Sequence, residues 1–387
     1  MIFGHDDAFY QACNGTWTAR EIAQQPTTWK KTINQINEMK GELKSFIDPL
    51  LADENLEIIF TGAGTIEFVG NALFSFINTC TGFRAKSYAS TDLVQTPAQY
   101  LNPNHKTLLV SFGRSGNSPE SVGAVQVVDV VCKENAYHLF ITCNNEGALA
   151  KAVATHPHAL AINLTPETHD KSFAMTSSFS NMMLAAMLCF NLDREAQLED
   201  AITAGQRFID EGYVAADKIV KEYDFNRIVY LGANVLKGIA QESRLKLCEL
   251  TAGRVDTVFD SPLGFRHGPK SVINDTTLTI VYISDDKYQR QYEYDLIKEM
   301  SGQRKGNKLV AVAARKYADI EELVDYYVSF DLEAPRENMY LAFDYIVFAQ
   351  VLALYKSIAM GSTPDNPCPT GEVNRVVQGV TIYPYEA

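Results

Sequence analysis

The sequence of 387 residues has no cysteine pair at the C-x-x-C spacing of redox and metal motifs, and its cysteines number seven, an odd count. Cys143 and Cys189 stand in apolar runs typical of buried thiols, so we expect a reducing cytoplasm instead of a disulfide-linked secreted domain. The first residues lack the basic lead and apolar core of a secretory signal. No apolar stretch approaches the ~20 residues that span a bilayer, so we expect no membrane partner.

Basic charge is also scarce. The 34 Lys and Arg residues face 47 Asp and Glu residues, which gives a net charge of −13. A field of that sign repels nucleic acid, so we expect no nucleic-acid partner. An anionic ligand would have to be bound by local dipoles and a few positioned groups. The G-x-x-x-x-G-K-[ST] loop that binds ATP is missing as well.

The hydrophobic pattern predicts an α/β fold. Apolar residues of the first fifty positions recur at helical spacing. Beyond them, short runs that are apolar almost throughout, as in parallel strands covered on both faces, occur at residues 57–61, 107–112, 138–143 and 160–164. Longer helical patterns separate these runs, and an apolar helical pattern closes each half at 179–192 and 341–360.

An internal repeat indicates that this α/β unit is duplicated. IIFTGAG at 58–64 reappears 170 residues later as IVYLGAN at 228–234. Two further apolar runs repeat at the same offset and a fourth repeats nearly so. The fold class predicted is therefore α/β, with two tandem doubly wound parallel-sheet domains. The organisation expected is an N-terminal helical segment (1–45), a first domain (46–212), a second domain (213–362) and a C-terminal tail (363–387).

Ligands of such sheets bind beyond the carboxyl ends of the strands, where a loop turns into a helix. The loop after the first strand, 62–67, begins like a dinucleotide fingerprint but has Glu67 in place of the third glycine. A carboxylate there would repel a pyrophosphate, which disfavours NAD and FAD. Two explanations of this loop stay open: a tight turn between strand and helix, or a site for one phosphate or sugar.

The loop after the second predicted strand, SFGRSGNSPES at 111–121, is more specific. Its glycines let backbone N–H groups converge, Ser115 and Ser118 add hydroxyls, and Arg114 adds a permanent charge. Pro119 suits the first position of a helix, and the dipole of that helix favours an anion. A cradle for one phosphate is the prediction, and a plain serine–glycine turn is the alternative. The matching segment of the second half, 284–286, is acidic, so we expect one phosphate site per chain.

The second half carries ionisable groups instead. Glu242, Lys246 and Glu249 share one helix face at i, i+4 and i+7, and a solvated ladder of weak ion pairs is the simple explanation. His267, held between turns in RHGP, is suited to proton transfer. His156 and His158 have metal-like spacing, but no acidic or cysteine cluster accompanies them in the sequence, so no metal site is predicted.

Four motifs, GAGT (62–65), SFGRSGNSPES (111–121), QESRLKLCEL (241–250) and RHGP (266–269), together resemble the sugar isomerase (SIS) family of tandem phosphosugar-binding domains. They are similar to the isomerase half of glucosamine-6-phosphate synthase. The resemblance implies that Glu249 shuttles the proton, with Lys246 and Glu242 on the same face, and that no cofactor is needed. It implies that His267 opens the sugar ring from a neighbouring subunit, hence a homodimer or higher homo-oligomer. The phosphate would be held by Gly64, Thr65, Arg114, Ser115, Asn117 and Ser118.

Two departures narrow the resemblance. Residue 2 is Ile where the synthase has the cysteine of a glutaminase domain, and Gln378 stands where its tail has an imine-forming lysine, so the tail is expected to be a lid at most. A chain of this length without a glutaminase resembles the D-galactosamine-6-phosphate deaminase group, also named tagatose-6-phosphate ketose/aldose isomerase. The expected reaction converts an amino-sugar phosphate to a ketohexose 6-phosphate and ammonium, as a hydrolase acting on C–N bonds. A plain aldose–ketose isomerase and a non-catalytic sugar-phosphate sensor are the alternatives.

Overall fold

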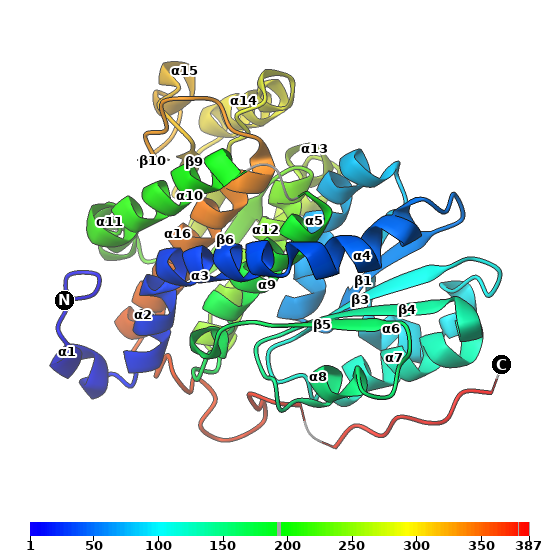
Figure 1. Ribbon diagram of the computed structural model, residues 1–387. Coiled ribbons are helices and arrows are strands. Elements are labelled where there is room, and N and C mark those ends of the chain that lie inside the picture. Colours follow the sequence, from blue (N-terminus) through cyan, green and yellow to red (C-terminus); the bar gives the residue numbers. More distant parts are fainter. Residues whose placement is uncertain (192–194, 378, 387) are drawn as a thin grey trace. The chain divides into compact units, whose positions relative to one another are not determined.

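Two five-stranded parallel sheets organise the chain (Figure 1). The computed structural model describes residues 1–191, 195–377 and 379–386. Around each sheet lies one compact unit. The first-sheet unit comprises Thr27–Asp170, Met175–Arg194 and Gly371–Ala387, and the second-sheet unit comprises Met1–Pro26, Lys171–Ala174 and Glu195–Thr370.

The first sheet has the strand order β2-β1-β3-β4-β5. Its strands are β1 (Glu57–Gly62), β2 (Ala85–Ala89), β3 (Thr107–Gly113), β4 (Ala136–Thr142) and β5 (Ala159–Asn163). Every residue of β3 is buried, as its unbroken apolar run predicts for a central parallel strand. Cys143 and Cys189 are buried free thiols, which confirms the interpretation of their surroundings.

Seven α-helices belong to this unit among the described residues, and four of them connect its strands. They are α4 (Lys40–Leu51), α5 (Thr65–Thr81), α6 (Ser90–Gln95), α7 (Pro119–Cys132), α8 (Ala148–Ala152) and α9 (Ser177–Phe190), with most of α3 (Gln25–Glu38). α5 ends at Gly82, whose left-handed φ of 67° a residue with a side chain adopts only at a cost. α9 is apolar on all sides because it is buried almost throughout, and it packs against α5.

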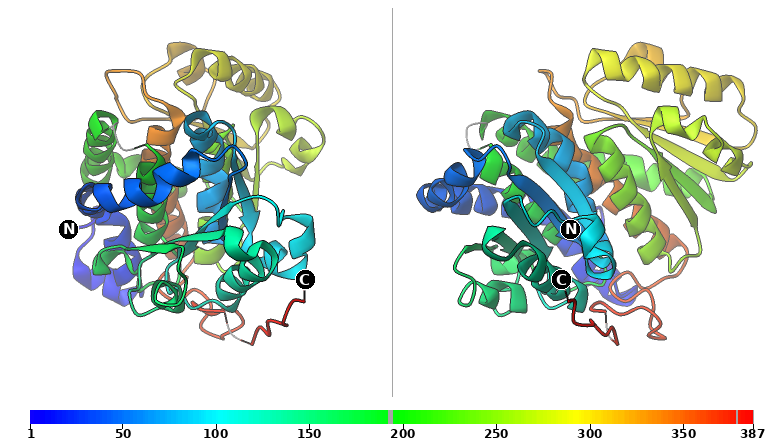
Figure 2. Two further views of the ribbon diagram at one scale, coloured as in Figure 1. Left: turned by 45° about the vertical axis from the view of Figure 1, so that its right-hand side comes forward. Right: turned by 90° about the vertical axis from the view of Figure 1, so that its right-hand side faces the viewer.

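The second sheet has the order β10-β9-β8-β6-β7. Its strands are β6 (Arg227–Leu231), β7 (Asp256–Asp260), β8 (Thr277–Tyr282), β9 (Lys308–Ala313) and β10 (Tyr326–Ser329). Counted along the chain within each half, both sheets follow the order 2-1-3-4-5. Figure 2 shows the ribbon from two further sides. The duplication predicted from the repeat is therefore present as duplicated topology.

The second-sheet unit also carries two short N-terminal helices and several helices around its sheet. These are α1 (Asp7–Ala12), α2 (Thr16–Ala23), α10 (Glu195–Arg207), α11 (Val214–Glu222), α12 (Val235–Leu250), α13 (Pro262–Phe265), α14 (Lys287–Gly302), α15 (Ala318–Glu321) and α16 (Asn338–Ala359). α12 packs along α16, the orange helix of Figure 1.

One expectation was wrong. α16 is long and apolar enough, over a stretch of 18 residues, to cross a bilayer, although the sequence was expected to contain no such stretch. Of that stretch, 94% is buried inside the protein, so tertiary packing accounts for its composition. Among the described residues it is the one helix that meets this test.

The strand order places the predicted loops. In the order 2-1-3-4-5, the chain leaves β1 and β3 toward opposite faces of the sheet, and ligands bind in the crevice outside the carboxyl ends of those two strands. The loop that contains Gly64 follows β1, and the loop that contains Ser115 follows β3. Both predicted phosphate-binding loops therefore flank the same switch point of the first sheet.

Candidate active site

The loop after β3 has a backbone that admits only glycine at two positions. A Cβ on Gly113 would lie 2.9 Å from the Cα of Gly116, which is closer than a Cβ can approach backbone. Gly116 has a φ of 66°, in the left-handed region. The side-chain amide of Asn144, which follows β4, donates to the Ser115 carbonyl at 2.8 Å. Asn144 thus holds the loop from a neighbouring strand, a role that its position in the sequence did not reveal.

The predicted side chains of this loop divide into two kinds. Ser115 and Ser118 are partly exposed, and their hydroxyls have only local partners: Asn117 N–H donates to Ser115 Oγ at 3.3 Å, and Ser118 Oγ donates to Ser121 Oγ at 2.7 Å. Asn117 instead accepts from Ala148 N–H at 2.8 Å, at the start of α8. The two serine hydroxyls can turn to an anion, whereas the Asn117 side chain positions the loop.

Two helix termini adjoin the loops that were predicted to bind the phosphate. Ser118 lies at the N-cap of α7 without a capping hydrogen bond from its side chain, and Pro119 occupies the first turn. Gly64 lies at the N-cap of α5 with a φ of 61° and has no capping oxygen to offer. Thr65, the next residue, is buried. A negative group beside these termini would meet the positive ends of two helix dipoles.

Two hydroxyls that the motifs did not single out lie beneath the same switch point. Thr61 and Ser111 are register partners on β1 and β3. Both are buried, and neither hydroxyl has a hydrogen-bond partner within the part of the chain that the structure describes. A buried unpartnered hydroxyl costs free energy unless a ligand or a water satisfies it. A polar residue near the carboxyl end of each of two otherwise apolar strands is the sequence signal that could have identified these hydroxyls.

The tail lies beside the phosphate loop. Arg114 is buried, and its Nη2 donates to the Arg375 carbonyl at 2.6 Å. Ile382 packs close to Gly123 on α7. Residues of the tail line a cavity of about 490 Å³ with α6 and α7. Gln378, the expected lid residue, lies outside the described residues.

In the second-sheet unit, the acid–base ladder on α12 is buried. Lys246 Nζ lies 3.3 Å from Glu242 Oε1 and 2.5 Å from Glu249 Oε2. The side chains of Glu242 and Lys246 are fully buried, and that of Glu249 is 22% exposed. The simple explanation, a solvated surface ladder, is therefore wrong. Only Glu249 is within reach of a ligand in solution.

Burial and charge act on Lys246 in opposite directions. Burial alone lowers the pKa of its ammonium, but the carboxylates of Glu242 and Glu249 raise that pKa by more, so the net shift is upward. Lys246 therefore stays charged at neutral pH. Its ammonium can donate to one oxygen of Glu249 and leave the other carboxylate oxygen to accept a proton.

His267 lies at an exposed turn after α13. Gly268 follows it with a φ of 116°, which a residue with a side chain rarely adopts. Arg266, directly before this pair, and Lys270, two residues after it, both form ion pairs with Glu299 of α14. Glu299 thus fixes the turn on which His267 is exposed. Among the described contacts, none joins His267 to the ladder of α12.

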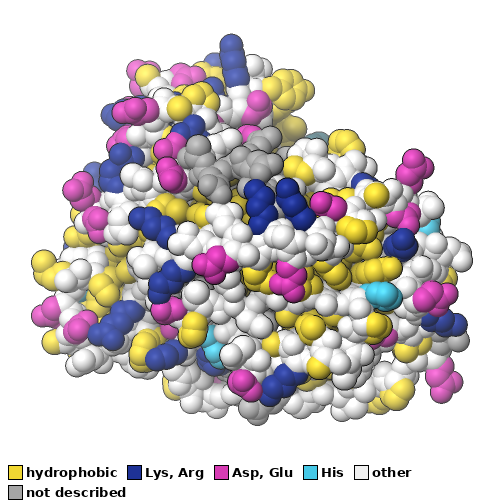
Figure 3. Space-filling view, viewed as in Figure 1, with side chains coloured by type: hydrophobic (Ala, Val, Ile, Leu, Met, Phe, Trp, Pro, Cys, Tyr) yellow, Lys and Arg dark blue, Asp and Glu magenta, His cyan; other side chains and the backbone are white. Residues whose placement is uncertain are grey.

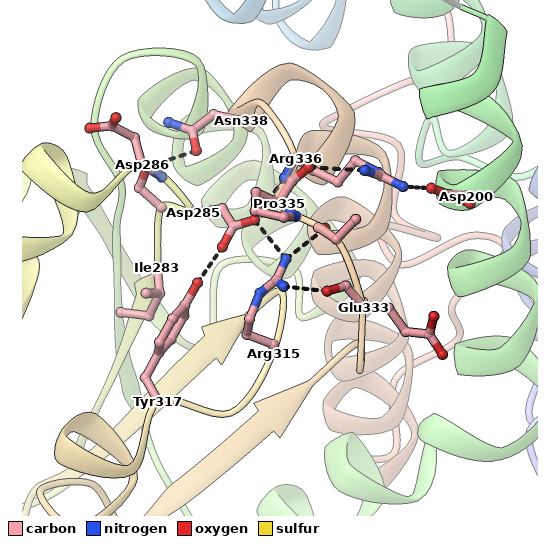
Figure 4. Close-up of polar contacts among 12 residues, drawn as sticks. Asp200, Ile283, Asp285, Asp286, Arg315, Tyr317, Glu333, Pro335, Arg336 and Asn338 are labelled. Atoms are coloured by element: carbon pink, nitrogen blue, oxygen red, sulfur yellow. Dashed lines mark hydrogen bonds and ion pairs between the residues drawn. The ribbon is translucent and has the colours of Figure 1, made fainter.

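The loop after β8, which corresponds to the phosphate loop by the repeat, is filled by its own carboxylate. Asp285 Oδ2 accepts from Arg315 Nη2 at 2.8 Å and from the Arg336 N–H at 2.7 Å, and Tyr317 donates to Oδ1 (Figure 4). The Asp285 side chain is 4% exposed. The donors around this loop, Arg315, the Arg336 N–H and Tyr317, are therefore engaged by Asp285.

This network allows a stability test. We expect Asp285→Ala to lower the free energy of unfolding by about 3 kcal/mol, since it leaves Arg315 without its carboxylate in a mostly buried position. Asp286→Ala is the matched control, because Asp286 only caps α14 through Gln289 N–H, a contact worth about 1 kcal/mol. Urea unfolding curves measure both losses. Equal losses would show that the Asp285 network contributes nothing beyond a helix cap.

Surface charge gives no competing anion site on the face seen in Figure 3. Among the described residues there, Lys and Arg side chains are interspersed with Asp and Glu instead of gathering in one area. This matches the acidic net charge of −13. Attraction of an anion by this chain therefore depends on local groups such as those of the loop after β3.

Comparison with known proteins agrees with this geometry. The sequence model of the SIS domain family matches residues 50–192 of this chain. These residues contain the whole first sheet and both loops at its switch point. This places the first-sheet unit in the class of SIS domains. Over 380 residues the chain is 41% identical to D-galactosamine-6-phosphate deaminase AgaS of Escherichia coli, with 97% of this chain and 98% of that protein covered. The chain belongs to the same family as this AgaS protein.

Solved structures show the same relationship. A protein of Clostridium novyi NT described as a tagatose-6-phosphate ketose/aldose isomerase superposes with a TM-score of 0.95 at 41% identity, over 100% of this chain and 99% of that one. The tagatose-6-phosphate ketose/aldose isomerase of Escherichia coli superposes with a TM-score of 0.89 at 38% identity, over 96% and 98%. The two-sheet architecture is thus shared along nearly the full length.

Proposed function

We propose that the chain is an isomerising deaminase that converts D-galactosamine 6-phosphate and water to tagatose 6-phosphate and ammonium. It is then a hydrolase of a C–N bond. The observation that carries the proposal is the buried Glu242–Lys246–Glu249 ladder, with one carboxylate accessible, in a chain that also has a phosphate cradle. The choice of galactosamine 6-phosphate as substrate rests on the name of the relative from Escherichia coli.

The phosphate group is assigned to the loops at the switch point of the first sheet. The hydroxyls of Ser115 and Ser118, the backbone around Gly64 and Thr65, and the charge of Arg114 bind it. Asn117 holds the loop in place through Ala148. Fixing the phosphate orients the open carbon chain, and orientation by remote binding lowers the barrier of the proton transfer.

Glu249 is the general base. In the open-chain sugar the C2–H bond lies next to the C1 aldehyde, so the C2 proton is acidic enough for a positioned carboxylate to remove. The Glu249 carboxylate takes this proton while the C1 carbonyl oxygen gains one, which gives an enolamine. Glu249 then delivers its proton to C1 as the amino nitrogen loses one, which leaves a C1 hydroxyl and a 2-imine. Lys246 holds one oxygen of Glu249, and Glu242 balances the buried ammonium.

Water completes the reaction. It adds to C2 of the imine, the C–N bond breaks, and ammonium leaves the ketose phosphate. His267 is assigned to ring opening, in which it moves a proton between the ring oxygen and the C1 hydroxyl. Its exposed position on a fixed turn is compatible with delivery to the site of a neighbouring subunit. No step requires a cofactor.

Ammonia release tests the proposal. The purified protein is incubated with galactosamine 6-phosphate and with glucosamine 6-phosphate, and ammonium and ketose phosphate are measured together. We expect both products in a 1:1 ratio, with the galacto substrate preferred. Absence of ammonium from both amino sugars would refute the deaminase.

The second candidate is a plain aldose–ketose isomerase, which the names of the two superposed structures favour. It would use the same carboxylate on a sugar without an amino group. Tagatose 6-phosphate therefore belongs in the assay as a substrate. Its conversion to an aldose phosphate, without ammonium from either amino sugar, would select this candidate. Binding without any turnover would select the sensor.

Replacing the two hydroxyls tests the phosphate site. We expect Ser115→Ala with Ser118→Ala to raise KM about 10- to 100-fold, because two hydrogen bonds to a charged group are lost, and to lower kcat less. Galactosamine without its phosphate is the control substrate, and kcat/KM for it is expected to be unchanged. An unaltered KM for the phosphorylated sugar would place the phosphate elsewhere.

The remaining assignments belong to the same proposal. The chain acts in the cytoplasm as a homodimer or higher homo-oligomer in amino-sugar catabolism. Its domains run over 46–212 and 213–362, after the segment 1–45 and before the tail 363–387. The tail, which contains Gln378, serves as a lid at most.

A further inference from the structure

Two histidines and an aspartate form a cluster in the first-sheet unit that the proposed reaction does not use. Asp129 comes from α7, His138 from β4, and His156 from the connection between α8 and β5. Nε2 of His138 lies 2.8 Å from Asp129 Oδ1, and Nε2 of His156 lies 2.8 Å from Asp129 Oδ2. One ligand atom from each residue lies within 4.8 Å of the others.

The cluster lies toward the amino ends of the strands, whereas the phosphate loop follows their carboxyl ends. His138 is the third residue of β4, near its amino end, and pairs with Leu109 on β3. The phosphate loop follows Gly113, at the carboxyl end of β3. Because the two strands are parallel, their amino ends share one edge and their carboxyl ends share the other. The cluster therefore has no direct role at the phosphate loop.

The imidazole of His156 is oriented as a metal ligand is, whereas Nδ1 of His138 has no hydrogen-bond partner among the described residues. His156 Nδ1 lies 2.7 Å from the Ala152 carbonyl, so it can carry the ring proton there and leave the Nε2 lone pair for a metal. His138 is 1% exposed and held within the sheet. Without a metal, both Nε2 atoms need a proton to donate to one carboxylate, which leaves His156 with a donor on each nitrogen.

We infer that this cluster binds one Zn²⁺ ion through His138, His156 and Asp129. Two imidazole nitrogens and a carboxylate oxygen suit zinc, whereas magnesium and calcium prefer oxygen ligands. Zinc bonds of about 2.0–2.2 Å place tetrahedral ligand atoms about 3.3–3.6 Å apart. The two 2.8 Å contacts are made to different oxygens of Asp129, so each contact opens by about 0.5–0.8 Å where its oxygen is a ligand. The side chains of His156 and Asp129 are 22% and 36% exposed, which leaves an entry path and room for that movement.

Such an ion is structural. It would join α7, β4 and the connection after α8 at one point, away from the loop that follows β3, so it would stabilise the first-sheet unit without entering the reaction. The sequence predicted no metal site because no acidic residue stands near His156 and His158. The fold supplies Asp129 instead, and His158 lies apart, with its ring on Tyr137.

Zinc content and thermal unfolding test the inference. Protein without an affinity tag is stripped with EDTA and dialysed against zinc, and the bound metal is counted by mass spectrometry. We expect about one zinc per chain, and a rise of about 3–8 °C in the unfolding midpoint when free zinc is about 100-fold above Kd. His156→Ala and Asp129→Asn should each bind less than a tenth as much zinc and lose the rise.

His158→Ala is the matched control, since it removes an exposed histidine two positions away and should retain both effects. The zinc-free midpoints of all variants show whether each one folds, and Asp129→Asn keeps the size of the side chain. Wild-type protein without stoichiometric zinc, or an equal rise in His156→Ala, would overturn the inference and leave a hydrogen-bonded ion pair. Activity of the EDTA-stripped enzyme is expected to persist, so either proposal can fail without the other.

Discussion

Glu249→Gln should bind the sugar phosphate with a Kd within a few-fold of the wild-type value and turn it over about 10²–10⁴ times more slowly. The amide keeps an oxygen that can accept from Lys246 but cannot take a proton from C2. Binding is unaffected because the phosphate is held by other residues. Calorimetric titration gives the Kd, and the coupled ammonia assay gives kcat.

Glu222→Gln is the control for this change, because Glu222 is an exposed acid at the end of α11 in the same unit. It should leave kcat and Kd unaltered. Wild-type turnover in Glu249→Gln would remove Glu249 from the role of base. A fall in kcat accompanied by an equal loss of affinity would assign it to binding instead.

Lys246→Met should lower the free energy of unfolding by about 3–5 kcal/mol and abolish activity. The substitution removes the cation that balances Glu242 in a fully buried position, and an uncompensated buried carboxylate is strongly destabilising. Lys237→Met on the same helix is the control. Lys237 Nζ lies 3.3 Å from Asp260 Oδ1, but the lysine side chain is 46% exposed. Lys237→Met should therefore lower the free energy of unfolding by only about 0–1 kcal/mol.

Adding Glu242→Gln to Lys246→Met distinguishes charge from shape. If the buried charge causes the loss, the double variant should regain at least about 1 kcal/mol over Lys246→Met, as coupled neighbours do. It should remain inactive, since Glu249 still lacks the ammonium that holds it. No recovery of stability would indicate that the packing of the lysine chain matters more than its charge.

The sequence predicted four strands of each sheet, including the edge strands β5 and β10, and missed the edge strands β2 and β7. β1, β3, β4 and β5 and their counterparts are apolar runs, and each lies within a few residues of its predicted range. β2 (AKSYA) and β7 (DTVFD) are largely half-buried and carry polar residues, so no apolar run marks them. Each is an edge strand of its sheet, where partial exposure replaces continuous burial.

Candidate site residues were predictable where a motif is local. The glycines and serines of the loop after β3 are contiguous, and the ladder on α12 follows helical spacing. Helical spacing shows which residues share a helix face but does not show whether that face is buried. The burial of Glu242 and Lys246 was therefore not predicted. Partners that the fold brings from other strands, such as Asn144 for Ser115 and Asp129 for His156, leave no mark in the local sequence.

The assignment of Glu249 and of the phosphate loop is tested most directly by a crystal structure of Glu249→Gln with galactosamine 6-phosphate bound. The account predicts the phosphate on the loop after β3, in contact with Ser115 and Ser118. It also predicts C2 of the sugar about 3–3.5 Å from the side chain at position 249, the distance of a reactive pair. A phosphate bound elsewhere, or a side chain at 249 directed away from C1 and C2, would contradict it.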